Sequence, residues 1–473
     1  MPGKSESLGI YSSLSSCPIP IWSRGNISAS SLVRVLPAIL GDGAYPAHGN
    51  LLREFPGRKP ALDTREERPN AGSNRSEGEL TTDHFITDEV GASGPKPLDL
   101  EPGRSPDVAM SKDPTFRLLG EAPTRSQRYK EYRGEWDRRG EELDESDHPV
   151  HVDLESVAVC DLRCGSSEED PQGFCQIWTH EHIRTQGFED HTYMRGYMDP
   201  HLYNDLLRQC ADIGVSSVKL NYRGEPSLHP EIADFVARAA ELEFPDIMMN
   251  SNGNGLGRKN PDLFAEIVEA GITDLMFSVD ACDEETYRLQ RVGGDWEVLL
   301  NSVRRAVETR ASGKAAPDCR IRASVVRTHL NAQAVDSGRM EEFWKDKMGV
   351  DWMSISECYF PAGSEHHWKA AHWRQLTAEE FQCTDSFRRM VVTWDGKHTM
   401  PCCQGFTLEI DGGPVVEGAA SPHLSVREAW ASQNFDRMRT AHRERTWDKP
   451  GAEGESICRS CAVTKVPTPI ELD

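Results

Sequence analysis

The stretch VHVDLESVAVCDLRC, residues 150–164, decides the fold. Its first ten residues form a valine-rich run that is typical of a β-strand. The run leads directly into Cys160 and Cys164, and a third cysteine, Cys175, follows in the next segment. A strand end that delivers several thiolates to one loop suits an iron–sulfur cluster. The stretch therefore predicts a strand with a metal site at its carboxyl end.

Similar runs recur along the chain and alternate with helical stretches. Strands are expected at 150–159, 217–222, 246–252, 273–280, 320–326 and 351–360. The segments between them have the apolar spacing of amphipathic helices, as in HLYNDLLRQCADIG and WEVLLNSVRRAVETR. This alternation predicts an α/β fold whose six parallel strands curl into a partial, TIM-like barrel. Active-site residues are then expected at the carboxyl ends of the strands.

The composition excludes several classes of protein. Of 473 residues, 27% are charged and 37% are hydrophobic, which excludes a bundle of membrane spans. Asp and Glu number 76 against 53 Lys and Arg, and the net charge of -23 repels phosphate backbones and anionic lipid. We therefore expect neither a nucleic acid nor a membrane as partner. The 13 cysteines, in a long chain that opens without a signal peptide, indicate a reducing, cytoplasmic location.

The chain divides into four parts by composition. Residues 1–109 are rich in Ser, Gly, Pro and Arg and keep no helical or strand period, which predicts a disordered N-terminal arm. Residues 110–149 are expected to form a helical lead-in and residues 150–374 the barrel. Residues 375–473 are richer in cysteine and less periodic, which predicts a Cys-rich C-terminal extension.

The first cysteine group resembles the signature of the radical S-adenosylmethionine (SAM) superfamily. That signature is Cys, three residues, Cys, two residues, Cys, with an aromatic residue just before the last cysteine. Cys160 and Cys164 fit this spacing. Phe174 supplies the aromatic residue before Cys175, but ten residues separate Cys164 from Cys175. Ser167 occupies the position at which the third cysteine is expected.

Three explanations of this spacing stay open. Residues 165–172 form an inserted loop that returns Phe174 and Cys175 to the cluster, or the third ligand has been lost and the site is degenerate. A sequencing or gene-model fault across the stretch is the third explanation. We favour the loop, because GFC followed by QIWTHEH restores the local pattern of the superfamily.

The resemblance implies a [4Fe–4S] cluster held by Cys160, Cys164 and Cys175. Three thiolates leave the fourth iron open to bind the amino and carboxylate groups of SAM. An electron, from a partner such as ferredoxin or flavodoxin, then cleaves SAM and leaves a 5′-deoxyadenosyl radical that abstracts hydrogen from an unactivated carbon.

The resemblance also implies that the later strand ends contact SAM. Gly224 and Glu225, in NYRGEPSLHP, resemble the superfamily's Gly-Gly-Glu element, in which a glycine allows close backbone approach and the carboxylate accepts from the ammonium group. Ser278 and Asp280, in FSVDA, would face the ribose hydroxyls together, because residues two apart in a strand share a face. The implied set is completed by Phe174, by Asn252 of the Asn-Gly pair after the third strand, and by Arg322 and Ser324 on the fifth strand.

The second cysteine group, beyond residue 375, resembles the SPASM extension of radical SAM enzymes. A hairpin is expected around Asp395-Gly396, and a helical run, VREAWASQNFDRMRTAHRER, follows it. The resemblance implies an auxiliary [4Fe–4S] cluster. Its implied ligands are Cys383, Cys402, Cys458 and Cys461, with Cys403 as substitute or bystander. A structural zinc site is the alternative that the spacing also allows. The barrel upstream makes us favour iron and sulfur.

The sequence thus predicts a radical SAM enzyme with a SPASM-like domain, either an oxidoreductase or a transferase-like enzyme, whose net reaction stays open. A peptide or protein is the expected substrate, and a sugar or other small metabolite is the alternative. A degenerate, non-catalytic metal-bound scaffold is the alternative class. Cys358 and Cys282 follow barrel strands closely, so either thiol could donate a hydrogen atom to a substrate radical, and Cys358 is our candidate for this catalytic role.

We expect residues 1–109 to be dispensable, because they lack the periodic apolar faces that a core requires. A protein that starts at Met110 should be soluble and should bind as much iron as the full chain, measured after anaerobic reconstitution. Loss of soluble expression on truncation would show instead that the arm belongs to the folded domain.

Overall fold

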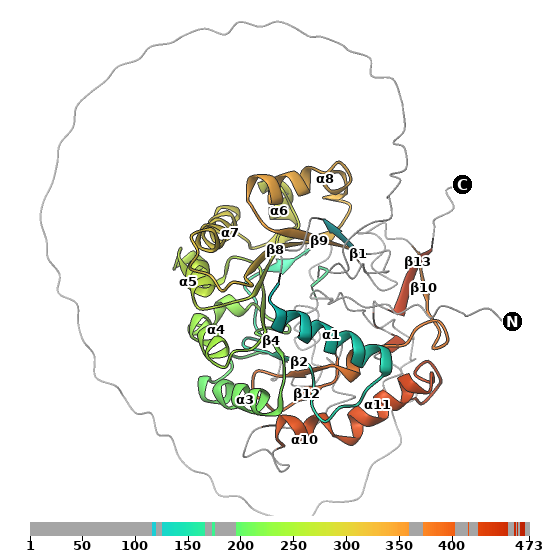
Figure 1. Cartoon of the computed structure of the whole chain (residues 1–473). Helices are drawn as coiled ribbons and strands as arrows, with labels where there is room; N and C mark the ends of the chain where they lie inside the picture. Colours follow the sequence, from blue (N-terminus) through green and yellow to red (C-terminus); the bar gives the residue numbers. More distant parts are fainter. Residues whose placement is uncertain are drawn as a thin grey trace, which may run out of the picture. The chain divides into compact units, whose positions relative to one another are not determined.

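The computed structural model contains the predicted parallel sheet. The six strands are β2 (His151–Leu154), β4 (Ser217–Lys219), β5 (Asp246–Ser251), β6 (Asp274–Ser278), β8 (Arg320–Arg327) and β9 (Trp352–Glu357). Each pairs in parallel with the next one along the chain. Figure 1 shows that this sheet is curved, with its helices on the outside. The prediction of an α/β partial barrel is confirmed.

The structure describes residues 116–119, 125–165, 173–175, 195–358, 372–402, 415, 424–452, 458–459, 461 and 464–468. These residues belong to one compact unit of the chain. The expected disordered arm, residues 1–109, lies outside the described residues, as do Ser167 and Cys403.

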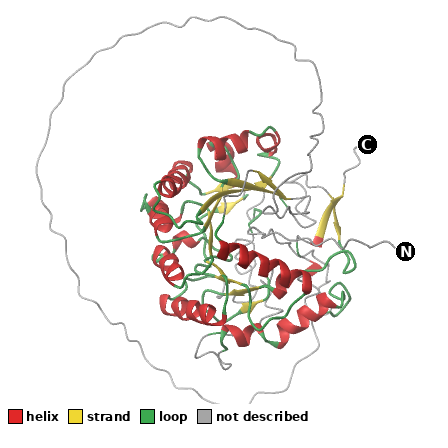
Figure 2. Ribbon diagram, viewed as in Figure 1, coloured by secondary structure: helices red, strands yellow, loops and turns green. Residues whose placement is uncertain are grey.

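Helices cover the outer face of the sheet (Figure 2). The main ones are α3 (Pro200–Ile213), α4 (Ile232–Glu241), α5 (Leu263–Glu269) and α7 (Trp296–Ala311). The ends of α3 follow from the sequence: the Asp199 side chain accepts hydrogen bonds from the first turn, and Gly214 ends the helix with φ +89°. Shorter helices complete this layer: η2 (Pro226–Leu228), η3 (Gly255–Arg258), α6 (Glu284–Gln290), α8 (Ala332–Asp336), α9 (Arg339–Glu341) and the π-helical turn η4 (Glu342–Lys347).

The two faces of the sheet differ in chemistry because side chains alternate along each strand. On β6, Leu275 and Phe277 belong to the main apolar core, which also holds residues of the covering helices. Asp274 precedes Leu275 and pairs with Arg322 on the neighbouring strand β8. The outer face is therefore apolar, and the inner face carries buried charge.

Three strands outside the six predicted ones extend this sheet to nine strands. β1 (Phe116–Leu119) pairs antiparallel with β9. β11 (Arg389–Val392) pairs in parallel with β2, and β12 (Thr399–Met400) pairs with β11 as the expected hairpin. Part of the Cys-rich extension thus belongs to the barrel sheet. The cause lies in tertiary contacts: Arg389 forms two hydrogen bonds with the fully buried Asp153 carboxylate, at 2.5 and 3.0 Å.

The remaining elements flank the sheet. α1 (Gln127–Glu142) lies within the expected helical lead-in, and η5 (Asp385–Phe387) precedes β11. The helical run expected after the hairpin is interrupted and forms two helices, α10 (Val426–Trp430) and α11 (Gln433–Arg443). The interruption lies at Ala431 and Ser432, where Ser432 has extended backbone dihedral angles and is the N-cap residue of α11. Two small sheets pair β3 (Arg163–Cys164) with β7 (Arg291–Val292) and β10 (His372–Gln375) with β13 (Lys465–Thr468). Among the helices of the described residues, none has the length and apolar character needed to cross a bilayer.

Candidate functional site

The three cysteines of the first group lie close together at the carboxyl end of β2. Burial raises the pKa of the Cys160 thiol well above its usual value, and the nearby thiols of Cys164 and Cys175 raise it further. Burial also raises the pKa of Cys164 to about 12, although Arg291 opposes this shift by donating from Nη1 to Cys164 Sγ at 3.3 Å. Without metal the Cys160 and Cys164 thiols hold their protons, so metal binding there would release protons.

The two ends of the long segment between Cys164 and Cys175 meet. The Phe174 backbone N–H donates to the Cys164 carbonyl at 3.1 Å, and the Gly165 N–H donates to the Gln290 carbonyl at 2.7 Å. Gly165 has φ +73°, and a Cβ there would lie 2.3 Å from the Phe174 ring. Only glycine fits this approach. The structure thus brings Phe174 and Cys175 back to the first two cysteines.

Glu225 is fully buried beside this group. Its carboxylate accepts from the Ser251 hydroxyl at 2.7 Å and from the backbone N–H groups of Asn252 at 2.6 Å and Ser227 at 3.0 Å. Burial raises its pKa to about 7 despite these hydrogen bonds. The Glu225 carboxylate is also near enough to raise the pKa of Cys160.

Gly224 holds two strand ends together. A Cβ at this residue would lie 2.2 Å from the Val157 carbonyl oxygen and 2.6 Å from that of Val159. The next residue, Glu225, donates its N–H to Val159 at 2.8 Å. In the described residues, Gly224 therefore allows its backbone to lie against residues 157–159, the segment that follows β2.

Asn252 connects the end of β5 to the cysteine loop. Its Nδ2 donates to Asp161 Oδ1 at 2.8 Å and lies 3.8 Å from Cys160 Sγ. Its Oδ1 accepts from the Asn254 N–H at 2.8 Å. The side chain is thus held by contacts at both ends.

Ser278 and Asp280 do not share a strand face as we expected. β6 ends at Ser278, and Asp280 has φ +56°, so strand alternation stops before it. The Asp280 carboxylate accepts from the Val326 N–H at 2.7 Å and lies 2.7 Å from Arg291 Nε. Arg291 also donates to Cys164, so it connects Asp280 to the cysteine group. Ser278 is half-buried at the strand end.

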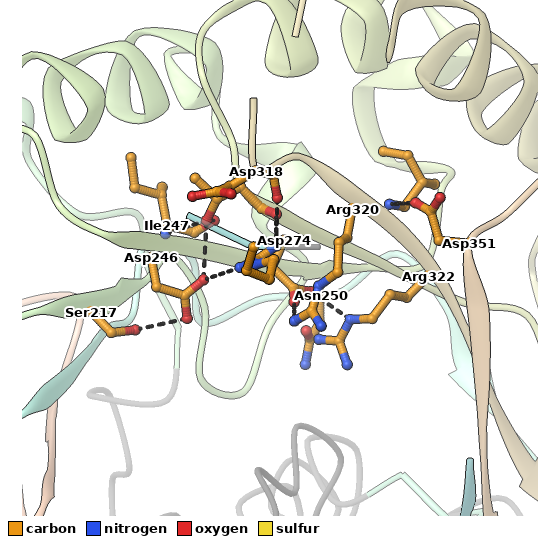
Figure 3. Close-up of polar contacts among 12 residues, drawn as sticks. Ser217, Asp246, Ile247, Asn250, Asp274, Asp318, Arg320, Arg322 and Asp351 are labelled. Carbon is orange, nitrogen blue, oxygen red and sulfur yellow. Dashed lines mark hydrogen bonds and ion pairs between the residues drawn. The ribbon is translucent and has the colours of Figure 1, made fainter. Parts of the chain in front are cut away.

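Arg322 and Ser324 lie at different depths in the barrel. Ser324, 4% exposed, is in register with Ser278 at the carboxyl end of β6. Arg322 lies nearer the amino end of β8, and its Nε donates to Asp274 Oδ1 at 2.5 Å (Figure 3). Among the described residues the Arg322 side chain pairs with Asp274, away from the cysteine group, so it does not join the site as expected.

Cys358 lies at the carboxyl end of β9. It packs against Phe174 and Val326, which places its side chain beside the end of the cysteine segment. Cys282 is half-buried, and Arg339 lies 3.9 Å from its sulfur. Of these two candidate hydrogen donors, Cys358 is the one that contacts the site.

Cysteines of the second group share one apolar cluster. Cys402 and Cys458 are buried among residues such as Phe381 and Trp447, and Cys383 packs against them. Cys461 is also buried, and its N–H donates to the Cys458 carbonyl at 3.2 Å. Within the described ranges, no three or more His, Cys, Asp or Glu side chains are arranged around a position for a single metal ion.

His442 connects two of these cysteines, and the sequence analysis missed it. Its Nδ1 accepts from the Cys383 backbone N–H at 3.3 Å, so the hydrogen of the neutral ring is on Nε2. Nε2 lies 3.4 Å from Cys458 Sγ, and burial lowers the His442 pKa to about 4. The neutral ring therefore donates to the thiol sulfur.

Arg291 and Asp161 were missed as well. Arg291 contacts Cys164 and Asp280, whereas Asp161 accepts from Asn252 and, at 3.1 Å, from the Gly255 N–H. Asp161 lies inside the quoted CDLRC stretch, where a carboxylate next to a cysteine could have been noticed. Arg291 follows a helix without any local signal of its role.

Comparison with known proteins identifies the class. Residues 173–312 match the radical SAM superfamily, a range that contains Cys175, Glu225, Asn252 and Asp280. The chain carries a radical SAM domain, and the resemblance to this superfamily inferred from its sequence is confirmed. The SPASM-like extension stays a prediction. Proteins of this superfamily are enzymes that use a [4Fe–4S] cluster and SAM.

Curated relatives match only part of this region. The probable GTP 3',8-cyclase of Methanocaldococcus jannaschii is 24% identical over 112 residues, which are 24% of this chain and 36% of that protein. Its counterpart from Methanothermobacter thermautotrophicus is 32% identical over 97 residues, 20% of this chain and 30% of that protein. The chain thus spans about a third of the length of the curated relatives it matches.

Similar solved structures include BtrN in complex with AdoMet and 2-DOIA, at 14% identity and a TM-score of 0.37, covering 66% of this chain and 92% of that one. Streptococcus suis SuiB bound to S-adenosylmethionine is 13% identical with a TM-score of 0.37, covering 71% and 75%.

Replacing Gly165 by alanine should open the cysteine loop, because the new Cβ would collide with the Phe174 ring. The matched control is Gly313→Ala, which has a similar φ of +79° but nothing within 4 Å of the Cβ position. We expect G165A to lose about 1–3 kcal/mol more stability than G313A. Thermal unfolding measures the loss, and alkylation of Cys175 should become faster in G165A alone. Equal losses and equal alkylation rates in the two variants would contradict the close packing.

Proposed function

We propose that this protein is an iron–sulfur enzyme that reductively cleaves SAM and abstracts a hydrogen atom from a bound substrate. The observation that carries the proposal is the meeting of Cys160, Cys164 and Cys175 beside Glu225, at the carboxyl end of a parallel strand. That is the position at which an α/β barrel carries its active site.

The residues present fit a cluster with three protein ligands. Three cysteines are near one another, and the carboxylates beside them are engaged: Glu225 by three donors, Asp280 by Arg291, and Asp161 by Asn252 and Gly255. We propose that Cys160, Cys164 and Cys175 hold the [4Fe–4S] cluster. With SAM bound, these cofactors supply the one-electron cleavage of a carbon–sulfur bond that activates an otherwise inert C–H bond.

The chain's own side chains would orient these cofactors. Glu225, with its pKa near neutrality, can accept from the ammonium group of SAM, and that positive charge would favour its ionised form. Asn252 and Arg291 donate toward Cys160 and Cys164 respectively, which stabilises negative charge on sulfur. Gly224, Phe174, Ser278, Asp280 and Ser324 are proposed to shape the cofactor site around them.

Cys358 is the proposed hydrogen-atom donor. Its thiol would transfer a hydrogen atom to the substrate radical and become a thiyl radical. A one-electron donor of the ferredoxin or flavodoxin kind, with a proton from water, would restore the thiol. The contact of Cys358 with Phe174 supports this role.

A peptide or protein is the proposed substrate, on the strength of the SPASM-like cysteine group. A small phosphorylated metabolite is the alternative, favoured by the name of the curated relatives, GTP 3',8-cyclase. Product analysis after turnover with each class of compound distinguishes the two.

We propose that Cys383, Cys402, Cys458 and Cys461 hold an auxiliary [4Fe–4S] cluster. Support comes from their shared apolar surroundings and from His442, which contacts both Cys383 and Cys458. A donor to a ligand sulfur raises the reduction potential of a cluster, so His442 would favour its reduced state. A structural zinc ion is the competing occupant.

Cys175→Ala should abolish the formation of 5′-deoxyadenosine from SAM under dithionite, because the cluster would lose its third thiolate. Ser167→Ala should leave the rate nearly unchanged, since a serine hydroxyl gives up its proton far less readily than a thiol. Product is measured by chromatography of anaerobic reactions. Full activity of C175A, or loss of activity in S167A alone, would contradict Cys175 as the third ligand. Absence of 5′-deoxyadenosine with the wild-type protein would support the degenerate-scaffold alternative.

Reconstituted protein should contain about eight irons and eight sulfides, four of each per cluster. The double variant Cys458→Ala/Cys461→Ala should lose half of them and keep the SAM-cleaving cluster. Iron, sulfide and zinc analysis with absorbance spectra measures this. One zinc per chain, with iron for only one cluster, would show that the second site is structural.

A further inference from the structure

Charged side chains on the inner face form a buried group at the amino ends of the central strands (Figure 3). Arg125 Nη2 lies 3.1 Å from Asp246 Oδ1, while Arg320 and Arg322 both pair with Asp274. Three guanidinium groups thus face two carboxylates. In the described part of the chain these arginines have no further ion pair, so one positive charge in the group is left uncompensated.

Several donors of this group have no acceptor. Arg322 Nη2, Arg320 Nε and Trp352 Nε1 are all buried and make no hydrogen bond within the described residues. The guanidinium carbons of both arginines lie 5.2 Å from the Trp352 ring, and Trp352 is the register partner of Arg322 on β9. Each buried donor has given up its hydrogen bond to water without gaining another, which is unfavourable. A ligand with acceptor atoms only would satisfy them.

Arg322 carries the charge that Asp274 does not balance. The Arg322 residue is 4% exposed. Within the ion-pair group its charged neighbours are Asp274 and Arg320, and both arginines share the single carboxylate of Asp274. Burial lowers the pKa of the Arg322 guanidinium, and repulsion from Arg320 opposes the attraction of Asp274. An additional anion would restore the balance.

This group lies beneath the cysteine loop. Arg322 is in register with Met276 of β6, which is in register with Asn250 of β5. Two residues further along these strands are Ser278 and Asn252, and Asn252 contacts the cysteine loop. Because alternate residues share a strand face, Arg322 is one inward-facing layer below that loop, and Asp274 and Arg320 are one layer deeper.

We propose that Arg322 and Trp352 form the subsite that binds an anionic group of the substrate, a carboxylate or a phosphate, inside the barrel. The planar guanidinium suits both oxyanions. The inference rests on the proposed function, because the substrate must lie below the cofactor to present a C–H bond to it. SAM and the anion would then bind together, each in its own layer.

The test uses anaerobically reconstituted full-length protein, without reductant, and isothermal titration with inorganic phosphate and with succinate. We expect wild-type protein to bind at least one of these anions, and Arg322→Gln to weaken that binding roughly tenfold or more. Arg322→Lys, which keeps the charge but not the planar fork, should lie between the two. The control is Arg305→Gln, since Arg305 is on the surface of α7 and pairs with Asp262 and Glu308. Preference for phosphate or for succinate identifies which anion the substrate carries.

Three outcomes would overturn the proposal. One is the absence of binding by wild-type protein up to about 10 mM of either anion. Another is equal weakening in R322Q and R305Q, which would place the anion on the surface. The third is displacement of the anion by SAM, which would assign Arg322 to the cofactor. Thermal unfolding of each variant shows whether it is folded. If R322Q is misfolded, the anion affinity of R322K is compared with that of the wild-type protein instead. The titration contains no reductant and therefore does not depend on SAM cleavage. If no anion binds, the proposed function is still tested separately by the SAM-cleavage experiment on Cys175.

Discussion

The approach of the Phe174 ring to Gly165 is the constraint on which the proposed cofactor site depends. A barrel of this kind would fold around its apolar outer face whatever the length of the cysteine segment. The third thiol reaches the other two only because the chain reverses at a residue without a side chain and closes with the hydrogen bond between Phe174 and Cys164. The two described ends of this segment, at Gly165 and Phe174, are therefore held together.

Much of the fold could be predicted from the sequence because local patterns encode it. The six parallel strands and the main helices follow from apolar runs and their spacing, and all six were found near the expected ranges. The sequence could not reveal that β11 joins the barrel sheet. That pairing is stabilised by a buried contact between Arg389 and Asp153, residues far apart in the chain, and neither has a local signature.

The site was predictable where a motif is contiguous and not where a partner comes from elsewhere. Glu225 and Asn252 lie beside the cysteine loop as their places at strand ends suggested. Asp280 and Arg322 differ because the backbone turns after Ser278 and because Asp274 attracts Arg322 deeper into the barrel. Arg291 lies in the short strand β7 and His442 in helix α11, and neither has a local sequence signature, so only the tertiary structure shows their contacts with cysteine sulfur.

The pairing of β11 with β2 has a mechanical consequence. β2 leads into Cys160, and β11 follows Cys383, so the two cysteine groups are attached to neighbouring strands of one hydrogen-bonded sheet. No hinge separates these two strands, and relative movement would require breaking their backbone ladder. The sheet itself therefore limits how far Cys160 and Cys383 can move apart, as a shared beam limits two fittings fixed to it.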